Sequence, residues 1–230
     1  MAEKLTVLIP CYNEKQTLLQ LLQRVENADI GAVEKEIILI DDFSTDSTRE
    51  LLQQQVEPKH KVIYNKQNRG KGYSIRQGLA AATGSIIIIQ DADLEYNPDN
   101  YADLLAPILK GEVQVVYGSR IRNKNNKRHS GYSFYLGGLF LSKLTNLLYG
   151  SSLTDEPTCY KVFRTEVLKP IKLHCEGFEF CPEVTAKVLK QGIKIVEVPI
   201  DYFPRKVTEG KKIRWRDGVE AIWTLVKYRF

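Results

Sequence analysis

Acidic side chains gather directly after three apolar runs in the first half of this 230-residue chain. They are Glu14, Asp41, Asp42, Asp91 and Asp93. Two aspartates one residue apart, such as Asp91 and Asp93, can reach the same hard cation, and Mg²⁺ or Mn²⁺ prefers one or two carboxylates plus phosphate oxygens. Crowded carboxylates also repel one another, and a divalent cation relieves that repulsion. The pattern DAD after IIIIQ therefore predicts a site for a divalent cation that carries a phosphate group; the alternative is an acidic loop that only caps a helix.

Cationic side chains that could hold a second phosphate group occur at several places along the chain. We single out Lys71, Arg120, Arg128 and Arg205, with Lys211 as a weaker candidate. Arginine suits this task because its planar guanidinium binds phosphate through two hydrogen bonds. Lys71 stands between two glycines at the start of an expected helix, where it could reach a bound diphosphate. The alternative for each is an ordinary solvated surface charge.

Strands that alternate with helices must position these side chains. We expect strands at 5–10, 36–40, 61–64, 85–89 and 113–117, and helices at 14–27, 46–55, 73–82 and from Asn97 onward. This alternation predicts right-handed crossovers and a mostly parallel sheet covered on both faces, an α/β fold. Ligands bind beyond the carboxyl ends of the strands in such a sheet. The acidic groups and Arg120 should therefore meet at one edge.

The second half of the chain is less regular, and no linker divides it from the first. We expect helices at 132–149, 183–191 and 217–228, and strands at 159–163 and 193–200. The leucine spacing of 132–149 is typical of a helix packed in a core, although its aromatic residues would also suit a membrane surface. We predict one domain over 1–230, with halves at 1–118 and 119–230.

The composition excludes several classes of protein. The net charge is +5, and the last 26 residues hold eight basic and three acidic residues, so they carry the whole excess. No stretch of 18 residues is uniformly apolar, which argues against a transmembrane helix, and the N-terminus lacks a signal peptide. We therefore expect a cytoplasmic protein whose four cysteines are free thiols. His174, Cys175 and Cys181 lack a fourth ligand for zinc.

Two other kinds of protein place acidic residues after apolar strands. Phosphatases of the haloacid dehalogenase type use a DxDx[TV] pattern on their first strand, whereas this chain continues with Leu94-Glu95 on its fourth. Response-regulator receivers are about half as long and need a phosphate-accepting aspartate after the third strand. Tyr64-Asn65 stands there in this chain. Both classes are disfavoured.

The ordered set of motifs resembles the family 2 glycosyltransferases with the glycosyltransferase-A fold. The set consists of IPCYNE, IDDFSTDST, NRGKG and IIIIQDADLE in the first half, then GSR, LTDEPTCYKVFR and VEVPIDYFPR. The last three resemble the branch of dolichol-phosphate mannose or glucose synthases. The resemblance covers about residues 5–216 and implies a Rossmann-like, mostly parallel central sheet. It makes 1–118 the nucleotide-sugar half and 119–230 the acceptor half.

The resemblance also implies a role for individual residues. The nucleoside would lie along Pro10, Tyr12, Glu14 and Asp41, with Asp42 as a weaker candidate. Asp91 and Asp93 would hold the metal on the donor diphosphate, and Glu95 stands where relatives have a further ligand. Asp155 or Glu156 falls near the family's active-site acid, although Asp155 could instead only cap its loop. Pro10 could merely end a strand, and Glu14 could merely begin a helix.

These features together predict a metal-dependent, inverting transfer of a hexose from GDP-mannose or UDP-glucose to a polyprenyl phosphate. An acceptor phosphate is already an anion near neutral pH, so the site needs cations more than a strong base. Arg120, Arg128 and Arg205 are the candidates for that task, and Asp93, Asp155 and Arg120 are the expected catalytic residues. The basic C-terminal stretch favours peripheral binding to anionic lipid, and no nucleic acid is expected. The alternatives are a saccharide or other acceptor, and an inactive relative that binds membrane or nucleic acid.

Overall fold

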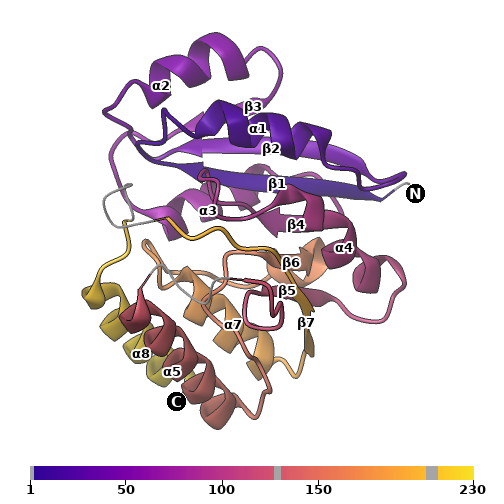
Figure 1. Cartoon of the computed structure of the whole chain (residues 1–230), viewed down its shortest axis with the longest axis vertical. Coiled ribbons are helices and arrows are strands. Elements are labelled where there is room, and N and C mark those ends of the chain that lie inside the picture. The colour runs from indigo at the N-terminus through magenta and orange to yellow at the C-terminus, as the bar shows by residue number, and fades with distance from the viewer. Residues whose placement is uncertain (1–2, 127–130, 206–211) are drawn as a thin grey trace.

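The computed structural model describes residues 3–126, 131–205 and 212–230. These residues form one seven-stranded sheet with helices on both faces (Figure 1). In chain order the strands are β1 (Lys4–Cys11), β2 (Glu34–Asp41), β3 (Lys61–Tyr64), β4 (Ile86–Ile89), β5 (Val115–Ser119), β6 (Lys161–Arg164) and β7 (Ile195–Pro199). The expected α/β architecture is confirmed.

The order of the strands creates a switch point between β1 and β4. Across the sheet the strands run β3-β2-β1-β4-β6-β5-β7, so the chain first builds outward from β1 and then returns to its other side. β1 is parallel to both neighbours, and Cys11 at its end is level with Asp41 at the end of β2. Ligands of open α/β sheets bind at such a point, beyond the carboxyl ends of the strands.

The sheet is mostly but not wholly parallel. β6 pairs antiparallel with both β4 and β5, while β5 and β7 are parallel to each other. All four isoleucines of β4 are buried, as a central strand covered on both faces requires. β6 thus joins the half of the sheet made by the first ninety residues to the half made later.

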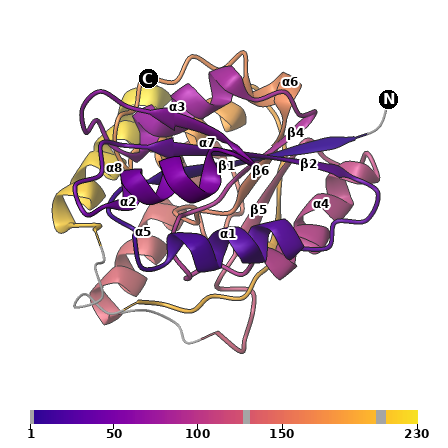
Figure 2. The same cartoon turned by 90° about the horizontal axis from the view of Figure 1, so that it is seen from above.

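Helices cover the two faces of the sheet. They are α1 (Leu18–Asn27), α2 (Thr48–Leu51), α3 (Lys71–Ala81), α4 (Tyr101–Leu109), α5 (Tyr132–Tyr149), α6 (Thr165–Leu168), α7 (Phe180–Lys190) and α8 (Trp215–Arg229). A π-helical segment, Leu52–Val56, continues α2, and a 3₁₀ turn, Pro98–Asn100, precedes α4. Figure 2 shows α1 and α4 on one side of the sheet and α3 on the other. The apolar stripe of α1 is buried, as its spacing predicted.

The expected elements are present, with shifts at their ends. α1 begins four residues later than expected because residues 14–17 form a turn in which the Glu14 carbonyl accepts from Thr17 N and Leu18 N. The short helix α6 was not expected. β5 begins and ends two residues later than predicted. β6 begins two residues later and ends one residue later than predicted.

Of the two environments that the sequence left open for residues 132–149, the packed core is wrong. The bounds of α5 agree with the prediction, but its buried residues are Ser142 and Thr145, while Leu147 is 82% exposed. The two hydroxyls donate to carbonyls one turn earlier, Ser142 to Gly138 and Thr145 to Leu141. α5 therefore buries two hydroxyl side chains and leaves part of its apolar surface exposed.

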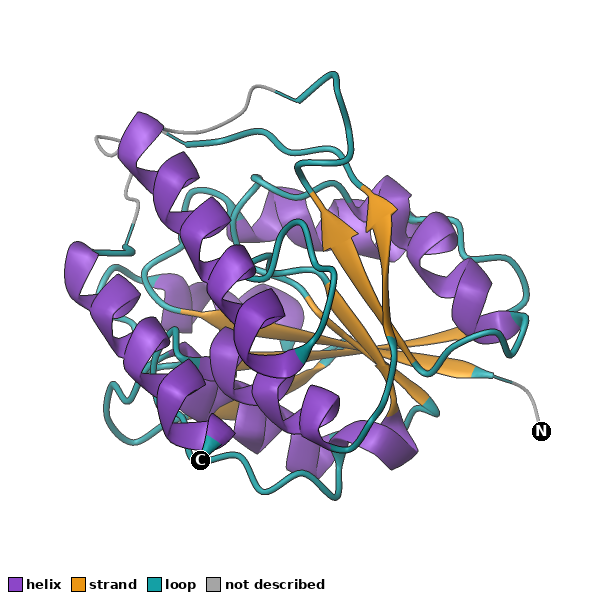
Figure 3. Cartoon of the chain, turned by 90° about the horizontal axis from the view of Figure 1, so that it is seen from below, coloured by secondary structure: helices purple, strands orange, loops and turns teal. Residues whose placement is uncertain are grey.

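Helix α8 packs beside α5 (Figure 3) and buries Ala221, Thr224 and Leu225, but it also leaves large apolar side chains exposed. Trp215 is 75% exposed and Trp223 is 63% exposed. Among the described residues, no helix is both long and apolar enough to cross a membrane.

Candidate functional site

Four carboxylates meet at the switch point, and Arg205 lies among three of them. Its guanidinium is 2.6 Å from Asp93 Oδ2, 3.2 Å from Glu14 Oε2 and 3.7 Å from Glu95 Oε1. The Arg205 backbone N–H also donates to Glu95 at 2.8 Å. The arginine side chain is only 17% exposed. The carboxylates come from the ends of β1 and β4, and the segment after β7 supplies the cation that neutralises them.

Lys71 neutralises the fourth carboxylate, Asp91. The two side chains form an ion pair, and the ammonium also lies 3.6 Å from the Cys159 sulfur. Burial alone would raise the pKa of Asp91, but the Lys71 charge, hydrogen bonds from Lys71 and Cys159 and the Arg205 charge together outweigh burial, so that pKa is lowered. The backbone N–H groups of Gly70 and Gly72 are already used, by Asp42 and by the Gly177 carbonyl. Lys71 therefore reaches the site through its side chain, while the surrounding backbone is committed to the fold.

Asp93 stands in an electrostatically unfavourable environment for a carboxylate. Burial, with the nearby charges of Asp91 and Glu95, raises its pKa to about 7, although Arg205 opposes the shift. A carboxyl group in this state is half protonated near neutral pH. The site therefore holds more negative charge than its own cations comfortably balance.

The charge of a divalent cation would offset this surplus of negative charge. The groups on offer are carboxylate oxygens, which Mg²⁺ and Mn²⁺ prefer, and the Arg205 guanidinium stands among them as an internal cation. Within the described ranges, however, no three His, Cys, Asp or Glu side chains converge closely enough to hold a metal ion. Asp91 faces Lys71, whereas Asp93 and Glu95 face Arg205. The metal role of these three residues stays a prediction.

The residues expected along the nucleoside lie at the ends of β1 and β2. Asp41 is fully buried and accepts from Ser44 N and Arg49 Nε, so its carboxylate already supports the loop. Asp42 accepts from the backbone N–H of Arg69 and of Gly70, which is a structural task. Pro10 and Tyr12 are half-buried beside Glu14, and the Tyr12 carbonyl accepts from Lys212. Their contact with a nucleoside remains a prediction.

Arg120 is held by Asp155 in a two-pronged ion pair. Arg120 Nε and Nη2 donate to the two carboxylate oxygens at 2.8 and 2.7 Å, and its backbone N–H donates to the same group. The guanidinium also lies over the Tyr202 ring, 5.1 Å from its centroid. Asp155 is 3% exposed, so here it acts as the anchor of the arginine.

Sequence reasoning missed Glu197, which holds this pair in place. Its buried carboxylate, on β7, accepts from the backbone N–H groups of Thr154 and Asp155 at 2.9 Å and from the Thr154 hydroxyl at 2.8 Å. The only signal was an acid within the apolar run IVEVP, which needs hydrogen-bond partners if it faces the interior. The chain of contacts runs from Glu197 through Asp155 to Arg120.

Glu156 directly follows Asp155 in the chain, and its carboxylate contacts helix α7. It is fully buried, accepts from the Thr185 hydroxyl at 3.0 Å, and burial raises its pKa. Its second carboxylate oxygen has no hydrogen-bond partner in the described part of the chain. All four cysteines are free thiols, as expected.

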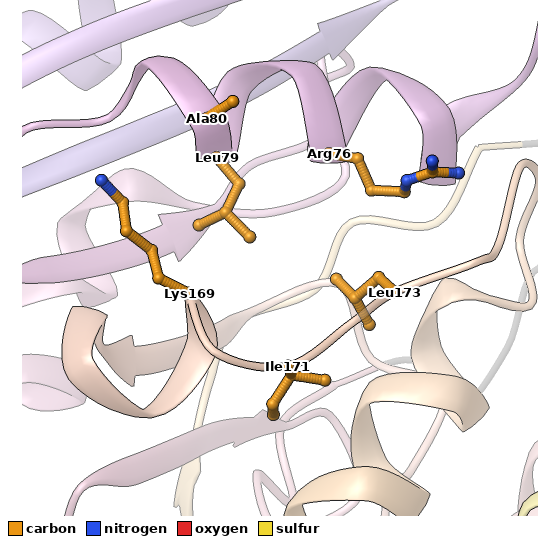
Figure 4. A pocket seen from close by; sticks show the side chains of 6 residues that line it. All are labelled: Arg76, Leu79, Ala80, Lys169, Ile171 and Leu173. Carbon is orange, nitrogen blue, oxygen red and sulfur yellow. The ribbon is translucent and has the colours of Figure 1, made fainter.

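Some expected residues lie elsewhere. Arg128 and Lys211 fall outside the described residues. A hollow of about 320 Å³ lies between α3 and the segment after α6, lined by Arg76, Leu79, Ala80, Lys169, Ile171 and Leu173 (Figure 4). It includes none of the predicted site residues.

Comparison with known proteins gives a consistent family. The family model described as Glycosyl transferase family 2 matches residues 6–171. The UDP-N-acetylglucosamine–dolichyl-phosphate N-acetylglucosaminyltransferase of Methanococcus voltae is 30% identical over 220 residues, covering 87% of this chain and 86% of that protein. The dolichol-phosphate mannosyltransferase of Pyrococcus furiosus is 29% identical over 217 residues, covering 90% of this chain and 59% of that protein.

A solved structure shares the fold at low sequence identity. Glucosyl-3-phosphoglycerate synthase from Mycobacterium tuberculosis, in complex with Mn²⁺, UDP-glucose and phosphoglyceric acid, aligns with a TM-score of 0.75 and 19% identity. The alignment covers 99% of this chain and 80% of that chain.

Proposed function

This chain belongs to glycosyl transferase family 2 and has the glycosyltransferase-A fold, and we propose that it transfers a hexose from a nucleotide sugar to a polyprenyl phosphate. The two relatives named above carry dolichyl-phosphate or dolichol-phosphate in their names, which supports the proposed acceptor. GDP-mannose and UDP-glucose are the proposed donors.

The observation that carries the proposal is the opposition of charges at the switch point. Glu14, Asp93 and Glu95 surround the Arg205 guanidinium, and Asp91 pairs with Lys71. Such a surplus of buried carboxylate, with Lys71 and Arg205 beside it, suits a ligand that brings both a metal ion and a diphosphate. Asp91 and Asp93 would hold the metal, with Glu95 as a further ligand.

The chemistry that follows is displacement of a nucleoside diphosphate. A bound divalent cation would offset the negative charge that develops on the leaving diphosphate. Lys71 and Arg205 lie where they could bind the same phosphates once those replace the carboxylates as partners. Direct attack by the acceptor would invert the anomeric carbon and give a β-linked product from an α-linked donor.

Arg120 is the proposed ligand of the acceptor phosphate. Asp155 occupies Nε and Nη2 of the guanidinium, which leaves Nη1 for an incoming anion. Asp155 also fixes the orientation of the guanidinium. The arginine would therefore be preorganised to bind the phosphate. Asp155 would thus act by positioning Arg120. The acceptor phosphate carries its own negative charge, so no strong base is required.

The exposed apolar side chains of α5 and α8 support binding to a membrane surface. Tyr132, Leu136, Phe140 and Leu147 recur along α5, and Trp215, Val219 and Trp223 recur along α8, all at least 46% exposed. The exposed basic residues Arg214, Arg216 and Lys227 accompany them. Tryptophan and tyrosine favour the boundary between water and lipid, and basic residues favour anionic headgroups. We propose peripheral binding there; the expected cytoplasmic location stays a prediction.

A transfer assay tests the function. The full chain is incubated with GDP-mannose or UDP-glucose and a short polyprenyl phosphate, in Mn²⁺, in Mg²⁺ or in EDTA. We expect metal-dependent transfer to the lipid phosphate with one of the donors. Metal-dependent turnover with a saccharide acceptor alone would refute the lipid phosphate, and no turnover with either donor would refute the donor and the acceptor together.

Sedimentation with vesicles tests the membrane surface. The full chain should sediment with phosphatidylserine vesicles at low salt, and Trp223→Glu should weaken that binding. Leu19→Glu is the matched control, because Leu19 is an exposed apolar residue on α1. Equal binding by the two variants would refute the proposed surface.

A further inference from the structure

The backbone of Phe43 adopts a conformation that aromatic residues rarely accept. Its φ is 63°, in the left-handed region that favours glycine and asparagine. The residue follows Asp41 and Asp42 directly after β2, and it is 41% exposed. A bulky residue kept in this region, with its ring in solvent, is a cost to the fold, and such costs collect at functional sites.

The exposed ring of Phe43 is nevertheless held in place. The Arg49 guanidinium lies 5.3 Å from the Phe43 ring centroid and 5.2 Å from that of Tyr64. Arg49 is itself fixed, because Nε donates to Asp41 at 2.9 Å and Nη2 donates to the Asn65 carbonyl at 2.8 Å. The ring therefore has a rigid support, as a stacking surface for a planar ligand requires.

The loop that carries Phe43 is joined to the loop after β1. Asn13 N donates to the Ser44 hydroxyl at 3.0 Å, and Thr45 N donates to the Asn13 side chain at 2.8 Å. Tyr12 therefore lies in a loop fastened to that of Phe43, at the ends of two adjacent strands (Figure 1). Both loops open onto the edge of the sheet where ligands of this fold bind.

The spacing of the strands gives the approximate distance between Phe43 and the carboxylates. Asp91 and Asp93 follow β4, which is two strands away from β2 in the sheet. Neighbouring strands are about 4.8 Å apart, so the two strand ends are separated by about 10 Å. That separation is comparable to the length of a nucleoside. A diphosphate held near the carboxylates would thus place its base near Phe43.

We infer that Phe43 stacks on the nucleobase of the donor, supported from behind by Arg49. This inference rests on the proposed function, because it needs a nucleotide at the switch point. Aromatic rings stack on any base through its flat face, so the contact would strengthen binding of both guanine and uracil nucleotides. It also explains why a strained aromatic residue stands where glycine would be relaxed.

Calorimetric titration of the full chain in Mn²⁺ with GDP, with UDP and with inorganic pyrophosphate tests the inference. Phe43→Gly should weaken binding of a nucleotide that the wild type binds by about 5- to 100-fold, the equivalent of losing one stacked base. Binding of pyrophosphate should not change. Because glycine accepts the left-handed backbone, the thermal midpoint of Phe43→Gly should equal or exceed that of the wild type.

Two further variants separate the ring from the backbone. Phe43→Tyr keeps the ring and should keep nucleotide affinity, whereas Phe43→Asn tolerates the backbone, lacks the ring and should behave like glycine. Unchanged nucleotide affinity in Phe43→Gly, or an equal loss for nucleotide and pyrophosphate, would overturn the inference and leave the proposed function standing. If the wild type binds neither nucleotide, the proposed function fails, and the inference fails with it.

Discussion

Replacing Arg205 by methionine tests whether the carboxylates at the switch point depend on an internal cation. Methionine keeps much of the side-chain volume but leaves Glu14, Asp93 and Glu95 without the guanidinium. Removal of one partner from a buried ion pair costs about 3–5 kcal/mol. We expect the low end, about 3 kcal/mol at pH 8, because Lys212 still pairs with Glu14 at 2.7 Å.

The cost should depend on pH in a defined direction. The folded-state pKa of Asp93, about 7, lies above the ordinary aspartate value of 3.8, so the folded protein favours the protonated form. The free energy of unfolding therefore falls as pH rises from about 4 to about 7. Loss of Arg205 raises that pKa further and extends the fall above pH 7. The deficit of the variant should be largest at pH 8 and smallest at pH 5.

Urea denaturation at pH 5 and pH 8 measures the effect, and a thermal melt at pH 8 should show a loss of about 6–12 °C. Mn²⁺ should raise the melting point of Arg205→Met more than that of the wild type. In the variant, Mn²⁺ does not compete with a guanidinium for the carboxylates. Arg24→Met, which alters an exposed arginine of α1, is the control. A deficit that is equal at both pH values, or an equal response to Mn²⁺, would refute this reasoning.

Three further substitutions test other parts of the site. Asp93→Asn should lower transfer by about 10²-fold or more in enzyme assays, and urea denaturation at pH 8 should show no loss of stability. Retained activity would remove Asp93 from the metal role. Glu197→Gln should raise the KM for the acceptor and leave nucleotide affinity unchanged in calorimetry, since it loosens Asp155 and Arg120; a change confined to the donor would contradict that link. Gly70→Ala should destabilise the protein by about 2 kcal/mol or more in urea denaturation, because its φ is 95° and a Cβ would lie 2.4 Å from the Glu176 carbonyl oxygen; equal stability would contradict the observed packing.

The sequence predicted the elements better than their surroundings. Patterns of apolar residues located every strand of the sheet to within about two residues at most ends, because alternation and burial are local properties of a segment. The same pattern gave α5 its bounds but the wrong environment. Apolar spacing reports that a helix has an apolar side, and it does not report what covers that side.

The candidate site shows the same division. Asp91, Asp93 and Lys71 could be placed near one another because they follow strands and precede helices at one edge of the sheet. The pairing of Arg205 with Glu14 joins residues 191 positions apart and depends on where the segment after β7 lies. No local pattern encodes such a contact. Glu197 was missed for a similar reason, since its partners come from a loop more than forty residues earlier.

The place of β6 in the sheet has a consequence for synthesis of the chain. β4 is a run of four isoleucines whose second edge is covered only when Lys161–Arg164 has been made, about seventy residues later. At 5–20 residues per second, the ribosome needs several seconds for that interval. During it, a β-branched apolar edge is open to pairing with other chains. Fragments that end before residue 161 should therefore aggregate, and chaperones that cover strand edges should act early on this protein.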